Sequence, residues 1–362
     1  MRVIIAGGGT GGHIFPAVAV GQALQRLQPG VELLFVGAKG KMEMEKVPQE
    51  GFKIVGLDIA GFNRSHMLKN IRLPYKVVKS YLQARSILKN FKPDAVMGVG
   101  GYASFPVLNA AQKKNIPTLI QEQNSYAGKS NMILGKRAKT VCVAYEHMDK
   151  FFPKDKIMIT GNPVRKNISA MRVTKQQGAE KFGLDINKKT VLIIGGSLGA
   201  RSVNEAITAH ANTMLSMGVQ LLWQTGKPYY QYARQKESAD IKVHEFIKDM
   251  EYAYAAADIV VSRAGALAIA ELCIVGKPVI FVPYPHAAEN HQTSNAMALV
   301  NRGAAIVVKD SEVKNELSNK IKELLRDDEV QKKMSGNIAA MAIRDADERI
   351  AKQIIQIAGS NK

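Results

Sequence analysis

Two glycine-rich turns, each directly behind a short apolar run, constrain the fold of this chain more than any other feature. The first reads Gly-Gly-Gly-Thr-Gly-Gly-His over residues 7–13, and the second reads Gly-Gly-Ser-Leu-Gly-Ala over residues 195–200. A buried strand that turns through glycines into a helix leaves backbone N–H groups pointing outward at the positive end of that helix, where anions bind. Two such turns predict two similar α/β domains that face one another across a cleft.

Further apolar runs alternate with segments of helical periodicity, which is typical of doubly wound parallel sheets covered by helices on both faces. We expect strands at 3–6, 32–36, 95–99, 117–120, 140–144, 191–194, 219–223, 258–261 and 278–282. Residues 160–165 have the composition of a hinge. Because 362 residues suffice for two domains, we expect one over 1–164 and another over 165–340. Helices are expected over 311–335 and from about 341 to 357.

The net charge of +19 is concentrated in the first half of the chain. Residues 1–164 hold 23 Lys and Arg against 10 Asp and Glu, a balance of +13, whereas residues 165–362 hold 27 against 21, a balance of +6. Between Asp58 and Asp94 there are eight basic residues and no acidic one. Such a field attracts nucleic acid, an anionic membrane surface or phosphorylated substrates. Nucleic acid is disfavoured, because no basic-aromatic module of the RNA-binding kind is present.

The basic segment 64–92 contains a candidate membrane-surface helix. From about 68 to 91, apolar and cationic residues recur at spacings of three and four, which places each set on its own helical face. The apolar set is Ile71, Tyr75, Val78 and Leu82, and the cations stand at 69, 72, 76 and 79. Pro74 must lie in a first turn or at a kink. Two interpretations stay open: a helix resting on anionic lipid, or one packed on the core with a solvated basic face.

The first glycine turn fits the G-x-G-x-x-G pattern of dinucleotide-binding proteins, which by itself is weak support for such a site. A dinucleotide site also needs an acidic residue at the end of the next strand. Here that strand continues into Gly-Ala-Lys-Gly at 37–40, so NAD is disfavoured. His13 follows the turn, and its ordinary pKa of about 6.5 suits a general base. Position alone leaves open whether it is a base or only hydrogen-bonds the loop.

The second turn is the better candidate for a diphosphate, because the Ser197 hydroxyl joins the backbone donors, and Arg165 and Arg201 could add charge-assisted hydrogen bonds. A third strand-to-helix turn follows at 260–267. Beyond it, Glu271 could accept hydrogen bonds from ribose hydroxyls or be an exposed helix glutamate.

Other polar groups have plainer explanations. Gln and Asn at 121–124 follow a strand and could be loop caps or ligands. The acidic residues of Asp-Ala-Asp at 345–347 lie in a helical region, so helix capping explains them better than a metal does. Cys142 and Cys273 are expected as buried free thiols of a reducing compartment. No apolar run reaches the ~18 residues that a spanning helix needs.

Taken together, the motifs resemble those of one known family in order and spacing. They are Gly-Gly-Thr-Gly-Gly-His at 8–13, Gly-Val-Gly-Gly-Tyr at 98–102, Glu-Gln-Asn at 122–124, Gly-Asn-Pro-Val-Arg at 161–165, Gly-Gly-Ser at 195–197 and Arg-x-Gly-Ala-Leu-x-x-x-Glu at 263–271. This ordered set resembles the MurG glycosyltransferases over nearly the whole chain. The resemblance implies the GT-B architecture, with two Rossmann-like domains, the nucleotide sugar in the C-terminal domain, and a last helix, about 341–362, that packs back on the first domain.

The resemblance also implies roles for individual residues. His13 would be the base, Glu271 would hold the ribose, the backbone of Ile247 would meet the uracil, the Ser197 loop would hold the diphosphate and Gln292 would contact the sugar. The implied UDP-GlcNAc-binding residues are Thr10, Gly11, Gly12, Asn124, Arg165, Ser197, Ile247, Ala266, Leu267, Glu271 and Gln292. Four positions depart from common family patterns, which leaves their side-chain contacts open: Gln121, Leu198, Ala264 and Ala268.

The implied activity is an inverting transfer of N-acetylglucosamine from UDP-GlcNAc to the 4-hydroxyl of the N-acetylmuramoyl-pentapeptide of lipid I, which is linked to undecaprenyl diphosphate. The product would be lipid II for peptidoglycan synthesis. No metal or cofactor is expected, and the enzyme would bind the cytoplasmic membrane face peripherally through segment 64–92. Alternatives are a UDP-GlcNAc 2-epimerase, another UDP-sugar transferase acting on a lipid glycoside, and a non-catalytic nucleotide-binding module.

Overall fold

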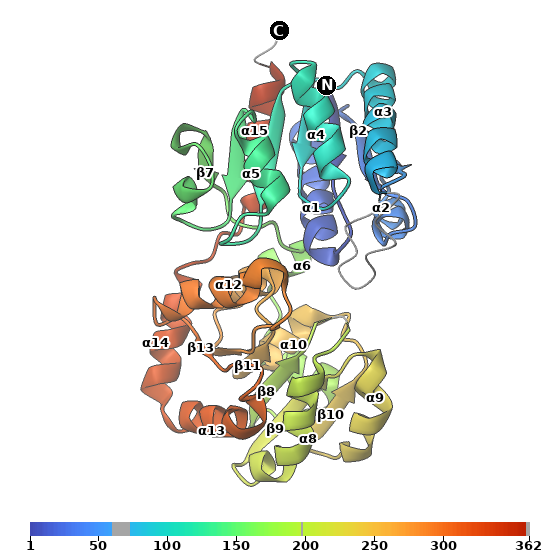
Figure 1. Ribbon diagram of the computed structural model, residues 1–362. Helices are drawn as coiled ribbons and strands as arrows, with labels where there is room; N and C mark the ends of the chain where they lie inside the picture. Colours follow the sequence, from blue (N-terminus) through green and yellow to red (C-terminus); the bar gives the residue numbers. More distant parts are fainter. Residues whose placement is uncertain (60–72, 197, 360–362) are drawn as a thin grey trace. The chain divides into compact units, whose positions relative to one another are not determined.

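A computed structural model describes residues 1–59, 73–196 and 198–359 of the chain. It divides into two compact units (Figure 1). Unit 1 comprises Met1–Arg165 together with the segment that begins at Asp345, and unit 2 comprises Lys166–Arg344. The division therefore falls at the end of the Gly-Asn-Pro-Val-Arg segment.

Unit 1 is built on a seven-stranded sheet in the order β3-β2-β1-β4-β5-β6-β7, and every neighbouring pair is parallel. Its strands are β1 (Arg2–Ala6), β2 (Glu32–Ala38), β3 (Ile54–Leu57), β4 (Ala95–Gly98), β5 (Thr118–Glu122), β6 (Thr140–Val143) and β7 (Ile157–Ile159). Its α-helices are α1 (Gly11–Leu27), α2 (Glu43–Gln49), α3 (Leu73–Phe91), α4 (Ser104–Lys113), α5 (Lys129–Gly135) and α15 (Ala346–Gly359). Pro74 is the second residue of α3, where a missing N–H costs no helical hydrogen bond.

The last helix of the chain, α15, completes the core of unit 1. Its residues Ile350 and Ile354 are fully or almost fully buried, in one apolar cluster with Ile14 and Val18 of α1 and with the central strands. An ion pair between Arg26 and Asp347, 2.9 Å between Nη2 and Oδ2, fastens the start of α15 to α1. Helices α3, α4 and α5 contribute to the second apolar cluster of the unit. The sheet is thus covered on both faces.

Unit 2 repeats this plan with six parallel strands in the order β10-β9-β8-β11-β12-β13. They are β8 (Lys189–Ile194), β9 (Val219–Gln224), β10 (Ile241–His244), β11 (Ile259–Ser262), β12 (Val279–Phe281) and β13 (Ile306–Val307). The α-helices are α6 (Lys166–Ser169), α7 (Lys175–Phe182), α8 (Arg201–Leu215), α9 (Lys227–Ala233), α10 (Met250–Ala256), α11 (Ala266–Val275), α12 (His291–Val300), α13 (Val313–Arg326) and α14 (Asp328–Ala339). The segment expected to be helical, 311–335, forms α13 and the first part of α14, and Asp327 separates the two helices and caps α14 by accepting from the Val330 N–H.

In both units the first strand lies between the second and the fourth strand of its sheet, which is the strand order of a Rossmann fold. The order reverses between β1 and β4 in unit 1 and between β8 and β11 in unit 2. Ligands of such sheets bind beyond the carboxyl ends of the strands at that reversal. The two glycine turns follow β1 and β8, so each stands at such a point.

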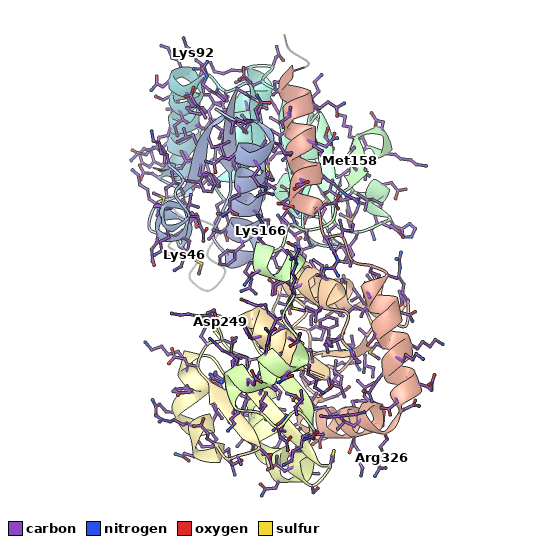
Figure 2. The ribbon with its side chains drawn as sticks, turned by 180° about the vertical axis from the view of Figure 1, so that it is seen from behind. Lys46, Lys92, Met158, Lys166, Asp249 and Arg326 are labelled. Atoms are coloured by element: carbon purple, nitrogen blue, oxygen red, sulfur yellow. The ribbon has the colours of Figure 1, made fainter. Side chains whose placement is uncertain are left out.

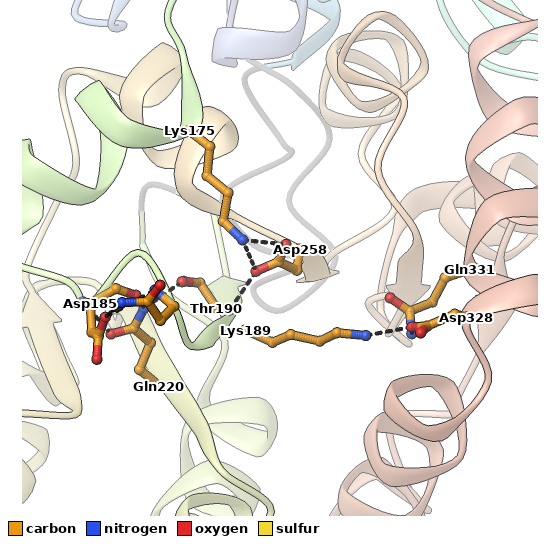
Figure 3. A network of polar contacts seen from close by, with 9 residues as sticks. Lys175, Asp185, Lys189, Thr190, Gln220, Asp258, Asp328 and Gln331 are labelled. Atoms are coloured by element: carbon orange, nitrogen blue, oxygen red, sulfur yellow. Dashed lines mark hydrogen bonds and ion pairs between the residues drawn. The ribbon is translucent and has the colours of Figure 1, made fainter.

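A polar network fixes the opposite, amino-terminal ends of the strands in unit 2 (Figure 3). The Asp258 carboxylate accepts from Lys175 Nζ at 2.8 and 2.9 Å and from the Thr190 N–H at 2.7 Å. Gln220 bonds the Thr190 hydroxyl and the backbone of Asp185. These contacts align β8, β9 and β11 from the end that is remote from the glycine turn.

Both cysteines are free and buried, and burial raises the pKa of each thiol to about 12. Neither is therefore suited to act as a nucleophile. In the described part of the chain, no helix has both the length and the apolar composition to cross a bilayer.

Candidate functional site

His13 lies at the strand reversal of unit 1, as the third residue of α1. Its Nδ1 is 3.1 Å from the Gly8 carbonyl oxygen and 3.3 Å from the Thr10 hydroxyl oxygen. A carbonyl can only accept, so the contact with Gly8 is a hydrogen bond when Nδ1 carries the hydrogen. In the neutral ring the lone pair then lies on Nε2. The imidazole is half-buried rather than sealed in the interior.

The His13 side chain packs against Gly100 in the turn after β4. A Cβ placed on Gly100 would lie 2.9 Å from His13 Nε2, and Gly100 has a φ of +91°, which side chains rarely adopt. Any other residue there would crowd the nitrogen that carries the lone pair. The Gly-Val-Gly-Gly-Tyr motif and the first glycine turn therefore form one local site.

Glu43 of α2, which was not predicted from the sequence, holds the first glycine turn by a hydrogen bond to its backbone. Its side chain is buried, and its carboxylate accepts from the Gly9 N–H at 2.8 Å and from the Ala38 N–H at 2.9 Å. No acidic residue stands at the end of β2, as the sequence analysis noted, but this one reaches the same region from the next helix. No periodicity or motif marked it in advance.

Buried amides join the remaining motifs of unit 1. Gln121 donates to Asn162 Oδ1 at 2.9 Å, Asn162 donates to the Gln123 carbonyl at 2.9 Å, and Gln123 donates to Gln121 Oε1. Gln123 also donates to the Val99 carbonyl, so the cluster ties together the turns after β4, β5 and β7. Gln121 is fully buried and has an internal structural role.

Asn124 is held by the buried Glu122 at the end of β5. The Glu122 carboxylate accepts from the N–H and the side-chain amide of Asn124 and also from Gly128 and Asn131. Burial raises the pKa of Glu122 and these hydrogen bonds oppose the shift. Glu122 thus fixes the half-buried Asn124 in place.

In unit 2, Arg263 braces the strand reversal between β8 and β11. Its guanidinium donates to Asp310 Oδ1 and to the Val282 carbonyl at 3.0 Å, and it reaches the Ser202 hydroxyl of α8 at 3.1 Å. Ser202 in turn donates to Asp310. Arg263 therefore holds the start of α8 in place, which makes it a support of the second glycine turn.

Gln224, at the end of β9, joins the second turn to the loop that carries Ile247. Its Nε2 donates to the Gly196 carbonyl at 3.0 Å and its Oε1 accepts from the Ile247 N–H at 2.8 Å. The Ile247 N–H is thus engaged within the protein. A ligand that accepts from the Ile247 N–H would have to displace Gln224 or share this donor with it.

Glu271 lies in α11, which begins at Ala266 and Leu267 directly after the third strand-to-helix turn. It is buried, with 7% of its surface exposed, and accepts from the Tyr254 hydroxyl at 3.1 Å. The alternative of an exposed helix glutamate is therefore wrong. Gln292, in the first turn of α12, accepts from the Tyr284 N–H at 2.9 Å.

The predicted site residues are thus distributed over the two units. Thr10, Gly11, Gly12, Asn124 and Arg165 belong to unit 1, and Ile247, Ala266, Leu267, Glu271 and Gln292 belong to unit 2. Ser197 lies outside the described residues. Arg201 is exposed and paired with Glu205 at 2.7 Å. Over the described ranges, no group of three or more His, Cys, Asp or Glu side chains is placed to hold a metal ion.

Helix α3 presents apolar side chains to solvent. Tyr75, Val78 and Leu82 are 68%, 59% and 56% exposed, whereas the helix packs on the core through Ala84 and Leu88. The apolar set assigned from the sequence is therefore not the face that packs on the core.

The same exposed face of α3 also carries cations. Arg85 and Lys89 continue it toward Lys92, which follows the end of the helix (Figure 2). Residues 64–72 of the basic segment, with the cations at 64, 69 and 72 and with Ile71, lie outside the described residues.

Both units match domains of one known glycosyltransferase family. Residues 3–143 match the glycosyltransferase family 28 N-terminal domain and residues 190–350 match the family 28 C-terminal domain. The UDP-N-acetylglucosamine–N-acetylmuramyl-(pentapeptide) pyrophosphoryl-undecaprenol N-acetylglucosamine transferase of Bacteroides thetaiotaomicron is 50% identical over 364 residues, which cover 99% of this chain and 98% of the relative.

Solved structures share the fold. MurG of Acinetobacter baumannii has a TM-score of 0.80 and 30% identity over 98% of this chain and 99% of its own. A UDP-GlcNAc 2-epimerase of Neisseria meningitidis has a TM-score of 0.69 over 98% of this chain and all of its own, but at 18% identity this likeness concerns the fold alone. The high identity over the full length lies with the transferases, and the chain belongs to the MurG family of GT-B glycosyltransferases.

Proposed function

We propose that this chain is a UDP-GlcNAc-dependent hexosyltransferase that moves N-acetylglucosamine to the 4-hydroxyl of lipid I and so forms lipid II for peptidoglycan synthesis. The observation that carries the proposal is the orientation of His13, whose Nδ1 is bonded to the Gly8 carbonyl while Nε2 faces Gly100. A neutral imidazole with its lone pair on Nε2 is suited to take a proton near neutral pH.

The reaction is a single displacement with inversion. As the acceptor 4-hydroxyl oxygen forms its bond to the anomeric carbon of GlcNAc, His13 Nε2 takes the hydroxyl proton and the bond to UDP breaks. The electron pair of that bond leaves with the diphosphate. The negative charge that develops there is stabilised by backbone N–H groups of the turn after β8 and by the start of α8, which has no acidic residue in its first turn. Preorganised donors of this kind contribute about 3–4 kcal/mol each in other enzymes.

Unit 2 would hold the donor. Glu271, fixed by Tyr254, is placed to accept from the vicinal ribose hydroxyls, and the Ile247 carbonyl to accept from the uracil N–H. The Ser197 loop, Ala266, Leu267 and Gln292 complete the proposed set for the nucleotide sugar. In unit 1 the proposed contacts are Thr10, Gly11, Gly12, Asn124 and Arg165.

A lipid acceptor would account for the basic charge of the first half of the chain and for the exposed apolar side chains of α3. Because its prenyl chain stays in the bilayer, the enzyme must reach the sugar from the membrane surface, and we propose the cytoplasmic face. The exposed Tyr75, Val78 and Leu82 with the neighbouring cations are suited to rest on anionic lipid.

The test uses the full chain with radiolabelled UDP-GlcNAc and a lipid I analogue. Label should appear in the lipid; release of UDP with an altered monosaccharide would indicate an epimerase, and binding alone a nucleotide-binding module. His13→Ala should lower turnover by ~10²–10⁴-fold, because general-base catalysis contributes that much. Its affinity for UDP, measured by calorimetry, should stay as in the wild type. Unchanged turnover in His13→Ala would remove His13 from the role of base.

A further inference from the structure

The peptide group between Gly8 and Gly9 is hydrogen-bonded on both sides to ionisable residues. Its N–H, on Gly9, donates to Glu43 Oε2 at 2.8 Å. Its C=O, on Gly8, accepts from His13 Nδ1 at 3.1 Å. A single planar peptide therefore stands between a buried carboxylate and the imidazole, and the two bonds polarise it in the same direction.

Glu43 is held in one position. It lies in the first turn of α2, its side chain is 1% exposed, and its second oxygen accepts from the Ala38 N–H at 2.9 Å. Both partners are N–H donors, which suits a carboxylate rather than a carboxylic acid. A Cβ on Gly8 or Gly37 would lie 2.4 Å from atoms of the Glu43 side chain, so these two glycines leave the space that it fills.

Charged side chains near Glu43, on α2, on α3 and directly after β2, make ion pairs and hydrogen bonds with other side chains. Lys39, directly after β2, and Lys79 of α3 both contact Asp58 at 3.0 Å. On α2 itself, Lys46 contacts Glu45 and Gln49 (Lys46 is labelled in Figure 2). The contacts that define the position of Glu43 are therefore those to the two backbone N–H groups.

We propose that Glu43 is a positioning residue for His13 and acts on it through the Gly8–Gly9 peptide. The carboxylate fixes the orientation of the peptide and strengthens the Gly8 carbonyl as an acceptor, which keeps the hydrogen on Nδ1 and the lone pair on Nε2. Glu43 also stabilises the positive charge that His13 acquires when it takes a proton. The relation is that of the buried aspartate to the histidine in Ser-His-Asp sites, with one peptide inserted. The proposal depends on the proposed role of His13 as base.

The kinetic test is Glu43→Gln with Glu45→Gln as its matched control, since Glu45 is two residues away on the same helix and exposed. A glutamine has one accepting oxygen and cannot serve both N–H groups. We expect kcat to fall by about 10–100-fold, the range seen when side chains that orient metal-bound histidines are replaced. The KM for UDP-GlcNAc should stay near its wild-type value, and the control variant should have wild-type kcat. Wild-type kcat in Glu43→Gln would overturn the proposal.

The double variant His13→Ala/Glu43→Gln separates this proposal from the proposed function. If Glu43 acts through His13, the double variant turns over as slowly as His13→Ala alone. A further loss equal to that of Glu43→Gln in the wild-type background would overturn the role of Glu43 and leave His13 as base. Wild-type turnover in His13→Ala would instead remove His13 from the role of base, whereas the absence of labelled lipid with the wild-type enzyme would overturn the proposed function.

A spectroscopic measurement can overturn the proposal with the wild-type protein alone, even if Glu43→Gln does not fold. In protein labelled with ¹⁵N-histidine, the His13 signals, assigned by their loss in His13→Ala, should show the neutral ring with its hydrogen on Nδ1. Glu43→Gln should shift them toward a mixture of tautomers, and Glu45→Gln should not. A wild-type ring with its hydrogen on Nε2, or a tautomer that Glu43→Gln leaves unchanged, would overturn the proposal.

Discussion

Replacement of the apolar face of α3 tests whether this helix enters a membrane surface. The change is Tyr75→Ser together with Val78→Ser and Leu82→Ser, three side chains that are 56–68% exposed and do not belong to the core clusters. Because they lie in solvent, their removal should leave the fold and its stability unchanged. An effect on lipid binding would therefore report a loss of contact with lipid.

The size of the effect follows from the exposed fractions. Moving a large apolar side chain fully from water into an apolar medium contributes about 1.5–3 kcal/mol. Since about 0.6 of each side chain is available, full immersion would contribute about 1–2 kcal/mol per residue and about 3–5 kcal/mol for the three. At 1.4 kcal/mol per tenfold, the triple variant should partition into vesicles roughly 100-fold or more weakly.

The cations of α3 should contribute to vesicle binding in a way that depends on salt, which distinguishes them from the apolar side chains. Lys79 is paired with Asp58 at 3.0 Å, so Lys76, Arg85 and Lys89 are the better choices for neutralisation. Each should contribute about 1 kcal/mol on an anionic surface, and screening by salt should reduce that contribution. The apolar contribution should persist at high salt and on neutral lipid.

The assay is co-sedimentation with vesicles of phosphatidylcholine, with and without phosphatidylglycerol, at low and high salt. Tyr232→Ser is the control, because Tyr232 is 57% exposed but lies on α9 of unit 2. Unchanged partitioning of the triple variant under all four conditions would refute the reasoning, and so would an equal loss in Tyr232→Ser.

Three further predictions concern donor binding, acid sensitivity and stability. Glu271→Ala should weaken the binding of UDP-GlcNAc by about 10–100-fold in calorimetry, since a hydrogen bond to a charged group is worth about 1.5–3 kcal/mol, and Tyr254→Phe by less; unchanged affinity in Glu271→Ala would contradict the ribose contact. Hydrogen bonds from Lys39 and then from Lys79 and Gln83 hold the pKa of Asp58 well below its usual range. The stabilisation is therefore present above the unfolded pKa of about 3.9 and lost as pH falls through the depressed one. The protection of the α3 amides against hydrogen exchange should therefore fall as pH is lowered below about 3.9. In Asp58→Asn this acid-dependent loss of protection should be absent. Asp258→Asn removes the negative charge and one of the two accepting oxygens that Lys175 and Thr190 use (Figure 3). It should lower stability by about 1–3 kcal/mol, seen as a lower denaturation midpoint with kcat unchanged. An unchanged midpoint would show that this network does not hold the strands.

The sequence predicts the interior of both sheets but not their borders. Every apolar run identified as a strand is one, with ends that agree to within two residues. The strands that it did not identify are β3, β7, β10 and β13, which are the outermost strands of their sheets. Central strands are apolar throughout because both of their faces are covered. An edge strand is partly exposed, as Met158 and Ile159 of β7 are, so its residues lack that continuous pattern.

For the candidate site as well, the sequence reveals only some of the residues. His13 and Glu271 could be singled out as candidates because each lies in a helix that directly follows a strand-to-helix turn, the place where ligands of such sheets bind. Glu43 and Gln224 could not, since each bonds a turn that is far away in sequence, 34 residues from Glu43 and 28 residues from Gln224. Their contacts with the turns depend on proximity in the folded chain, which no local sequence pattern encodes.

These two supporting residues also give the two similar glycine turns different electrostatic surroundings, which bears on the roles proposed for them. Behind the first turn stands a carboxylate, Glu43, whose negative charge disfavours an anion at the Gly9 N–H but stabilises an imidazole that becomes positive when it accepts a proton. Behind the second stands a neutral amide, Gln224, bonded to the Gly196 carbonyl at 3.0 Å. A neutral support leaves the positive end of α8 available to a diphosphate. The charge of the supporting side chain, rather than the glycine pattern, therefore favours the proposed assignment of the base to the first turn and of the leaving group to the second.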